Sequence, residues 1–337
     1  MEKGRHDYID TLRLCCILFI VLSHFDGDCF SYMTGISMMR IHLAKDGSLG
    51  LLMYGWTGKY ALALLCVISG FLVAMKYEGK DTCDVGSFVI TRYFRMMLPV
   101  MACNLLFGIL LKALGEQVGV FYFLKESIVP GLNSVNRNLW CIGSFLWGNI
   151  LICLICYLQK QGIRSLWSYA VLLPILICLQ DVWLLATVAG GACFGIAGWL
   201  KRKAPVNNWW LIGILPIIWL LPRGEESTIM YYRDILAAIL IMTAFYCLPT
   251  LQSIFACRFL NPLKKCSYSL FIVHGMTLFM VGPAWSLVQR WGITSGAGLF
   301  VSSFLVLFLI DLIAAYVVYY LSEVKLYKAI VKRFLPF

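Results

Sequence analysis

Three ionisable residues near the start of the chain, Asp10, Arg13 and His24, have types and a spacing suited to chemistry. Eleven helical residues turn the chain through about 1100°, so Arg13 and His24 share one helix face, roughly 16 Å apart along the axis. Asp10 lies one turn before Arg13 on that face. A guanidinium binds anions and an imidazole moves protons near pH 7. The pattern predicts a polar stripe that lines a passage between helices.

This stripe lies in an apolar chain. Of the 337 residues, 61% are hydrophobic and 13% are charged, whereas soluble domains have about 45–50% apolar and about 25% charged residues. We therefore expect an all-α polytopic membrane protein. An ionisable residue in a membrane span usually faces a cavity or a partner. Arg13 could instead snorkel to lipid phosphates, and His24 could be an ordinary interfacial residue.

The helices that must position these residues can be found as apolar runs of roughly 20 residues. We expect about ten spans around a central polar cavity. The fifth and sixth runs are separated only by Gln180 and Asp181, which predicts a tight hairpin. The runs lie near 9–25, 49–75, 92–114, 139–158, 166–180, 182–200, 207–222, 233–251, 267–289 and 293–321.

Charge in the connecting segments predicts the orientation. If the N-terminus is inside, most of the 28 lysines and arginines fall on the inner side, as the positive-inside rule requires. Both termini are then cytoplasmic, and the net charge of +11 needs no nucleic acid to explain it. Residues 322–337 read as a basic amphipathic tail on the anionic inner leaflet. The cysteines lie mostly in apolar runs, and we predict no metal site.

Two other stretches carry polar residues in or beside the expected spans. Arg92 and Arg95 are three residues apart at the inner mouth of the third span, where they could bind phosphate or anchor the helix. Ser69 and Gly70 interrupt the second span and could allow close helix packing or open the backbone to a ligand.

The late segment "SYSLFIVH", residues 267–274, places Tyr268 and His274 in the ninth span. His274 could be a functional group or a hydrogen-bonded buried imidazole. Glu323, at the start of the basic tail, could pair with an inner arginine.

Taken together, these stretches resemble the integral-membrane acyltransferase-3 family. The shared motifs are "DTLR" with the Arg13–His24 spacing, "SGF" at 69–71, "RYFRMMLP" at 92–99 and "SYSLFIVH". The chain departs from the family at Phe271, where tyrosine is common. It also has Phe145 in "LWCIGSF", 139–145, where many polysaccharide acetylases carry an acid.

The resemblance implies a single transmembrane acyltransferase domain over 1–337 in a bacterial inner or plasma membrane. Acetyl-CoA, or another acyl-CoA, would donate an acyl group from the cytoplasm. The acceptor would be a hydroxyl of a cell-surface glycan or of its lipid-linked precursor. A transporter or flippase is the main alternative, and a structural or signalling membrane partner is another.

The resemblance also implies roles for matched residues. His24 would be the general base or form an acyl-imidazole, and Asp10 would orient Arg13. Arg92 and Arg95 would bind the phosphates of CoA. Donors to the thioester oxyanion would come from Ser69, Tyr268 or Arg13, and His274 and Glu323 would support the site.

Overall fold

The computed structural model describes residues 7–26, 58–78, 84–113, 119–132, 139–203 and 228–334, together with the single residues 115, 136 and 213. These residues form helices and turns, with no strand among them. The chain divides into two compact units, which we describe separately. The first comprises Met1–Cys16, Lys59–Arg92 and Cys141–Lys264, and the second comprises Ile17–Gly58, Tyr93–Trp140 and Lys265–Phe337.

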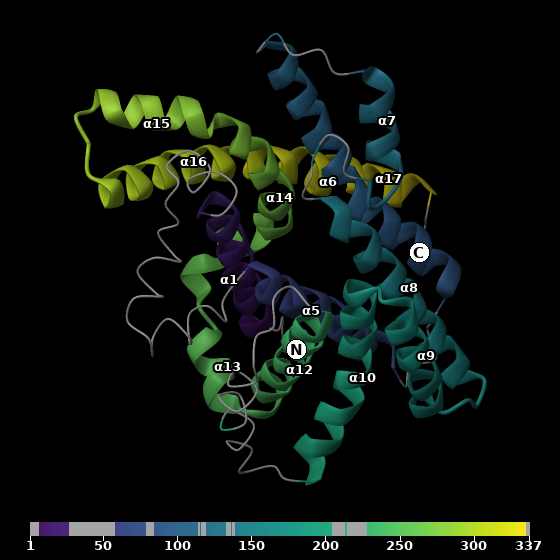
Figure 1. The fold of residues 1–337 in the computed structure, drawn as a ribbon. Helices are drawn as coiled ribbons and strands as arrows, with labels where there is room; N and C mark the ends of the chain where they lie inside the picture. Colours follow the sequence, from purple (N-terminus) through teal and green to yellow (C-terminus); the bar gives the residue numbers. More distant parts are fainter. Residues whose placement is uncertain are drawn as a thin grey trace. The chain divides into compact units, whose positions relative to one another are not determined.

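The first unit is built from helices that the apolar runs predict (Figure 1). This unit includes the first half of α1 and the start of α6. A short 3₁₀ turn in this unit leads into α14. The elements with residues in this unit are α1 (Asp7–His24), α5 (Gly58–Tyr77), α6 (Val85–Ala113), α8 (Trp140–Lys160), α9 (Ser165–Leu179), α10 (Val182–Lys203), α12 (Thr228–Cys247), α13 (Pro249–Phe255), η3 (Arg258–Leu260) and the start of α14 (Asn261–Thr277).

The second unit contains the rest of α1 and α6 and a series of helices that reaches the end of the described chain. Its further elements are α7 (Val120–Ile128), α14 (Asn261–Thr277), η4 (Leu278–Met280), α15 (Val281–Arg290), α16 (Gly296–Val318), the π-helix η5 (Tyr319–Leu326) and α17 (Tyr327–Phe334). Helices α15 and α16 lie side by side. Phe25, just after α1, packs against Phe300 and Phe304 of α16, with ring centroids 5.2 and 5.4 Å apart.

Six described helical segments are long and apolar enough to cross a membrane, or seven if a bent pair counts as one span. That pair is the main part of α12 with α13, which meet at 94°. Helix α1 is too charged to qualify, because its first two turns contain Asp7, Asp10 and Arg13, and α9 has only 15 residues. The expected run at 207–222 lies outside the described residues, apart from Gly213. The prediction of about ten spans is therefore not confirmed, and the central cavity and orientation remain predictions.

The predicted hairpin between the fifth and sixth runs is confirmed. Helix α9 ends at Leu179, α10 begins at Val182, and the two pack together. Gln180 takes a left-handed conformation with φ 57°. Asp181 accepts a hydrogen bond from the Leu184 backbone N–H at 3.0 Å and so caps the start of α10.

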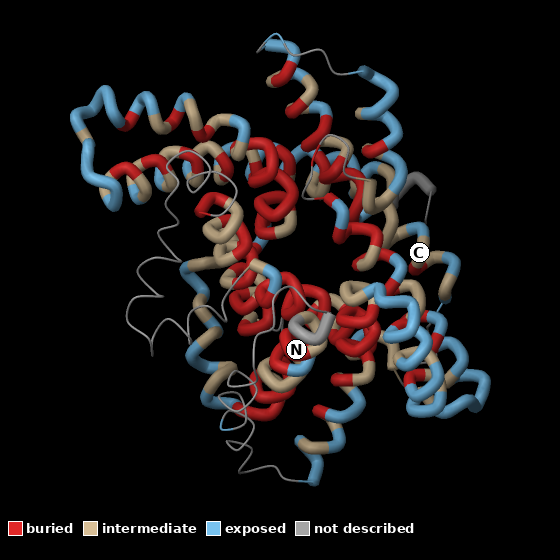
Figure 2. The backbone as a smooth tube through the Cα atoms, in the orientation of Figure 1, coloured by how far each residue is buried: buried red, intermediate tan, exposed pale blue. Residues whose placement is uncertain are grey.

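Glycines allow α5 to cross α10 at very short range. A Cβ atom on Gly70 would overlap the Thr187 carbonyl, and one on Gly190 would overlap the Val67 backbone. Figure 2 shows that α5 is buried along most of its length. Gly70 in "SGF" therefore serves close helix packing, which is one of the two uses that the sequence suggested.

Thiols behave as small buried groups in this fold. The twelve cysteines that the structure describes are all free. Cys193 on α10 donates to the Ile239 carbonyl of α12 at 3.6 Å, and Cys247 on α12 donates to the Ala197 carbonyl of α10 at 3.6 Å. These contacts show that α10 and α12 run in the same direction.

We predict that Gly70→Ala destabilises the protein by about 1–3 kcal/mol, because an added methyl group would force the α5–α10 crossing apart. Unfolding of the purified protein in detergent would measure this loss. Gly282→Ala is the control, since no atom lies within 4 Å of its added Cβ. Equal stabilities of the two variants would contradict the tight crossing.

Candidate active site

The first polar cluster lies at the start of α1 in the first unit. Nη1 of Arg13 donates to Oδ1 of Asp10 at 3.4 Å, and their side chains are 31% and 21% exposed. The two residues are three apart, so the helix itself sets this pairing. Helix α1 is unbroken from Asp7 to His24, as the shared-face argument requires. Asp10 thus contacts Arg13 in the way the sequence predicts.

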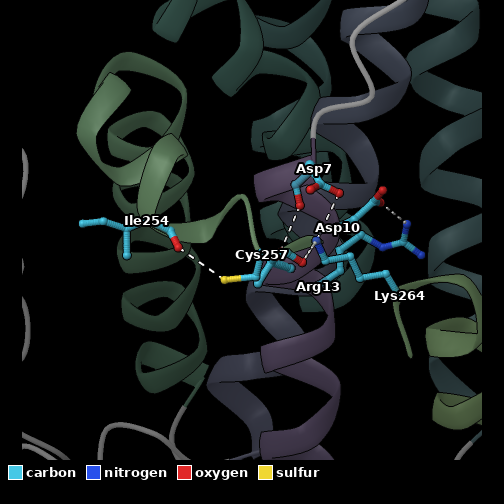
Figure 3. A network of polar contacts seen from close by, with 7 residues as sticks. Asp7, Asp10, Arg13, Ile254, Cys257 and Lys264 are labelled. Atoms are coloured by element: carbon cyan, nitrogen blue, oxygen red, sulfur yellow. Dashed lines mark hydrogen bonds and ion pairs between the residues drawn. The ribbon is translucent and has the colours of Figure 1, made fainter. Parts of the chain in front are cut away.

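Lys264 supplies a second ion pair close to the first (Figure 3). Its side chain is 0% exposed, and its Nζ donates to Oδ1 of Asp7 at 3.0 Å and to the Cys257 carbonyl at 2.7 Å. The charge pattern alone assigned Lys264 to the inner surface as a topology signal. The structure shows that it is buried. The Asp7 carboxylate and the Cys257 carbonyl take the place of the water molecules that would otherwise solvate its ammonium. Lys264 therefore ties the start of α1 to the chain before α14.

The third contact in this unit joins Arg92, Ser69 and Asn149. Nη2 of Arg92 donates to the Ser69 hydroxyl at 3.1 Å, and Nδ2 of Asn149 donates to the same hydroxyl at 3.0 Å. Asn149 is fully buried on α8. Ser69 thus accepts from two donors and holds the half-buried Arg92 in place. Arg95, one turn later on α6, is exposed.

The second unit brings two imidazoles together. The ring centroids of His24 and His274 are 5.4 Å apart, and the rings are tilted by 44°. His274 is buried, and its Nδ1 lies 2.6 Å from the Phe271 carbonyl. A carbonyl can only accept, so the proton of neutral His274 is on Nδ1 and Nε2 is an acceptor. His24 is only half-buried.

A buried carboxylate supports the helix that carries His274. The Thr277 hydroxyl donates to Oδ1 of Asp311 at 2.8 Å and also contacts the His274 carbonyl at 3.1 Å. Asp311 is 2% exposed and lies in the middle of α16. It therefore joins α16 to α14 at the turn that follows His274.

The two other predicted residues of the late motif region have partners within the second unit. Tyr268 donates to the Met96 carbonyl of α6 at 2.9 Å, and Ser269 donates to Oε1 of Glu323 at 3.3 Å. Glu323 lies in the π-helix η5, a type of distortion that is frequent at functional sites. Tyr268 and Glu323 thus fix the position of α14 against neighbouring helices.

Several buried polar residues lie outside the motifs and were not predicted from the sequence. Asn149 and Asp311 each interrupt a strongly apolar run, and this interruption was a signal that could have identified them. Asn136 gave no such signal because it lies in a connecting segment. Its backbone N–H donates to Glu126 at 2.7 Å, and its side chain donates to the Ile272 carbonyl of α14 at 3.1 Å.

The family follows from a comparison that covers nearly the whole chain. A family model with the description "Acyltransferase domain" matches residues 6–320. This range includes every site residue described in this subsection except Glu323. The chain belongs to the acyltransferase-3 family. Searches of curated proteins and of solved structures gave no match. The acyltransferase-3 assignment, made first from the motifs, is confirmed, and the protein is a multi-pass membrane acyltransferase.

We predict that Lys264→Gln lowers the free energy of unfolding by about 3 kcal/mol or less. Breaking an ion pair destabilises most when both partners are fully buried, and Asp7 is 23% exposed. Unfolding in detergent would measure the loss. Lys265→Gln is a matched control, because Lys265 itself is exposed. This substitution should change stability by about 0.5 kcal/mol or less. A stable Lys264→Gln variant would contradict the structural role of the pair.

Proposed function

We propose that this acyltransferase moves an acyl group, expected to be acetyl, from a cytoplasmic acyl-CoA to a hydroxyl. The hydroxyl belongs to a cell-surface glycan or to its lipid-linked precursor, and the protein works in a bacterial inner or plasma membrane. The contact between His24 and His274 is the observation that carries the proposal. A half-buried imidazole beside a second imidazole of fixed tautomer is suited to accept and return a proton.

His24 acts as the general base in this proposal. It takes the proton from the acceptor hydroxyl as the oxygen attacks the thioester carbonyl. The new C–O bond forms, the C–S bond breaks, and the CoA thiolate recovers the proton from the His24 imidazolium. Transfer through an acyl-imidazole is the alternative route with the same products.

Arginines bind the donor in this proposal. CoA carries phosphates, and arginine binds phosphate through paired hydrogen bonds. Arg95 is exposed and therefore accessible to CoA. Arg92 is ordered by its hydrogen bond to Ser69, which Asn149 holds in turn. Arg13, oriented by Asp10, supplies a further positive charge for the anionic donor. Because Ser69 and Tyr268 already have partners, we assign them to positioning rather than to oxyanion binding.

Membership of an acyltransferase family favours this function over the transporter or flippase that the polar residues alone would also allow. The two functions differ in one measurable property, because a transporter does not consume acyl-CoA.

We predict that His24→Ala lowers acyl transfer by about 10²–10⁴-fold, the usual contribution of a general base. Cells that express the wild type or the variant would be compared by mass spectrometry of their envelope glycans. Cys178→Ser, at an exposed cysteine of α9, controls for expression and folding. Normal acylation by the His24 variant would rule out its role as base.

We also predict that Arg92→Ala and Arg95→Ala each weaken CoA binding by about tenfold, the ratio set by one charge-assisted hydrogen bond. Calorimetry with CoA and the protein in neutral detergent would measure the affinities. Arg290→Ala removes an exposed arginine at the end of α15 and should bind CoA like the wild type. Unchanged affinity in both test variants would exclude this phosphate site.

A further inference from the structure

Arg233, near the start of α12, is a buried cation with part of its bonding capacity unused. Arg233 and Asp234 are 7% and 6% exposed, and Nη2 of Arg233 donates to Oδ1 of Asp234 at 3.1 Å. The buried Nε and Nη1 atoms have no hydrogen-bond partner within the part of the chain that the structure describes. Arginine stays charged at any physiological pH, so deprotonation cannot relieve this.

Two unmet donors on a buried guanidinium are costly, because each has lost its hydrogen bonds to water without gaining a replacement. An ion pair with a purely structural role would use the guanidinium fork more fully. Nε and Nη1 direct their free N–H groups to different edges of the planar guanidinium, and each can donate to an oxygen of a phosphate group. The unmet donors therefore indicate a missing oxyanion.

Other residues at the same end of the first unit fit such a ligand at a membrane surface. Nζ of the exposed Lys59 lies 5.4 Å from the ring centroid of Tyr231, and Trp183 packs edge-on against the same ring at 5.6 Å. Tyr60 is buried within electrostatic range of Asp234. Tyrosine and tryptophan are typical of the membrane–water interface. Lys59 adds a second positive charge, so the cluster has a net positive charge despite Asp234.

This cluster lies at one end of the first unit, at the starts of α5, α10 and α12. The ends of α5 and α10 instead carry Lys76 and the run Lys201, Arg202 and Lys203. The positive-inside rule places that basic end in the cytoplasm and the Arg233 cluster on the opposite side. A surface glycan or its lipid-linked precursor would be met on this opposite side.

We propose that Arg233, with Asp234, Lys59 and the Tyr231–Trp183 pair, forms a binding site for a phosphate group of an amphiphilic molecule. Resting on the function proposed above, this molecule is the lipid-linked acceptor. The free N–H groups of Arg233 donate to phosphate oxygens, Asp234 holds the guanidinium in position, and Lys59 attracts the charge. The aromatic pair lines the site at the lipid interface.

Binding of phosphate probes to the full-length protein in neutral detergent tests this site without any acyl transfer. Calorimetry and thermal unfolding would compare farnesyl phosphate, farnesol and inorganic phosphate. We expect farnesyl phosphate to bind and stabilise the protein, and farnesol to do neither. Equal binding of farnesol would overturn the phosphate site, and inorganic phosphate that binds as tightly as farnesyl phosphate would overturn its assignment to an amphiphile.

Arg233→Lys keeps the charge but removes the fork, so it should weaken farnesyl phosphate binding by about tenfold or more. Arg202→Gln, an exposed cation at the basic end of α10, should leave binding unchanged. If Arg233→Lys does not fold, Lys59→Gln carries the test, because its exposed side chain can be changed without loss of packing. Wild-type affinity in the folded variant would overturn the proposal.

The two proposals fail in different ways. His24→Ala should lose acyl transfer yet bind farnesyl phosphate like the wild type, because the probe needs no base. If His24→Ala keeps acyl transfer while Arg233→Lys loses phosphate binding, the role of His24 fails and the phosphate site stands. If phosphate binding is absent but His24→Ala abolishes transfer, the enzyme mechanism stands and the site fails.

Discussion

A charged or polar side chain in an apolar helical assembly must find a partner, and the polar architecture of this acyltransferase follows from that constraint. The ammonium of Lys264 is stable without water because Asp7 and the Cys257 carbonyl surround it. Arg13 lies against Asp10, and Arg92 lies against Ser69. The partners fix long, flexible side chains in single orientations, which is what a site for a polyanionic donor requires.

The close crossing of α5 and α10 serves the same constraint. Ser69 and Gly70 are adjacent in sequence but act on different neighbours. Gly70 lets the backbone approach Thr187, and Ser69 receives hydrogen bonds from Arg92 and Asn149. A larger residue at position 70 would move the hydroxyl at position 69. The short "SGF" motif therefore couples helix packing to the orientation of a proposed donor-binding arginine.

The histidine pair shows how backbone groups can control a side chain. The Phe271 carbonyl sets the tautomer of His274, and Thr277 and Asp311 support the following turn. Phe271 replaces the tyrosine that is common in the family. The contact with His274 uses the backbone carbonyl at this position, which is present with either side chain. The departure at this position therefore leaves the geometry of His274 intact.

The sequence by itself determined the class of protein, the approximate helices, the α9–α10 hairpin and the family, because hydropathy, turn residues and short motifs are local properties. It also found Asp10, Arg13, His24 and the late motif. Only the tertiary structure decided the partners, since Lys264 and Asp7 are 257 residues apart and Ser69 and Asn149 are 80 apart. The charge pattern could not distinguish the buried Lys264 from the exposed Lys265. Burial and hydrogen bonding depend on which helices meet, and no local pattern contains that information.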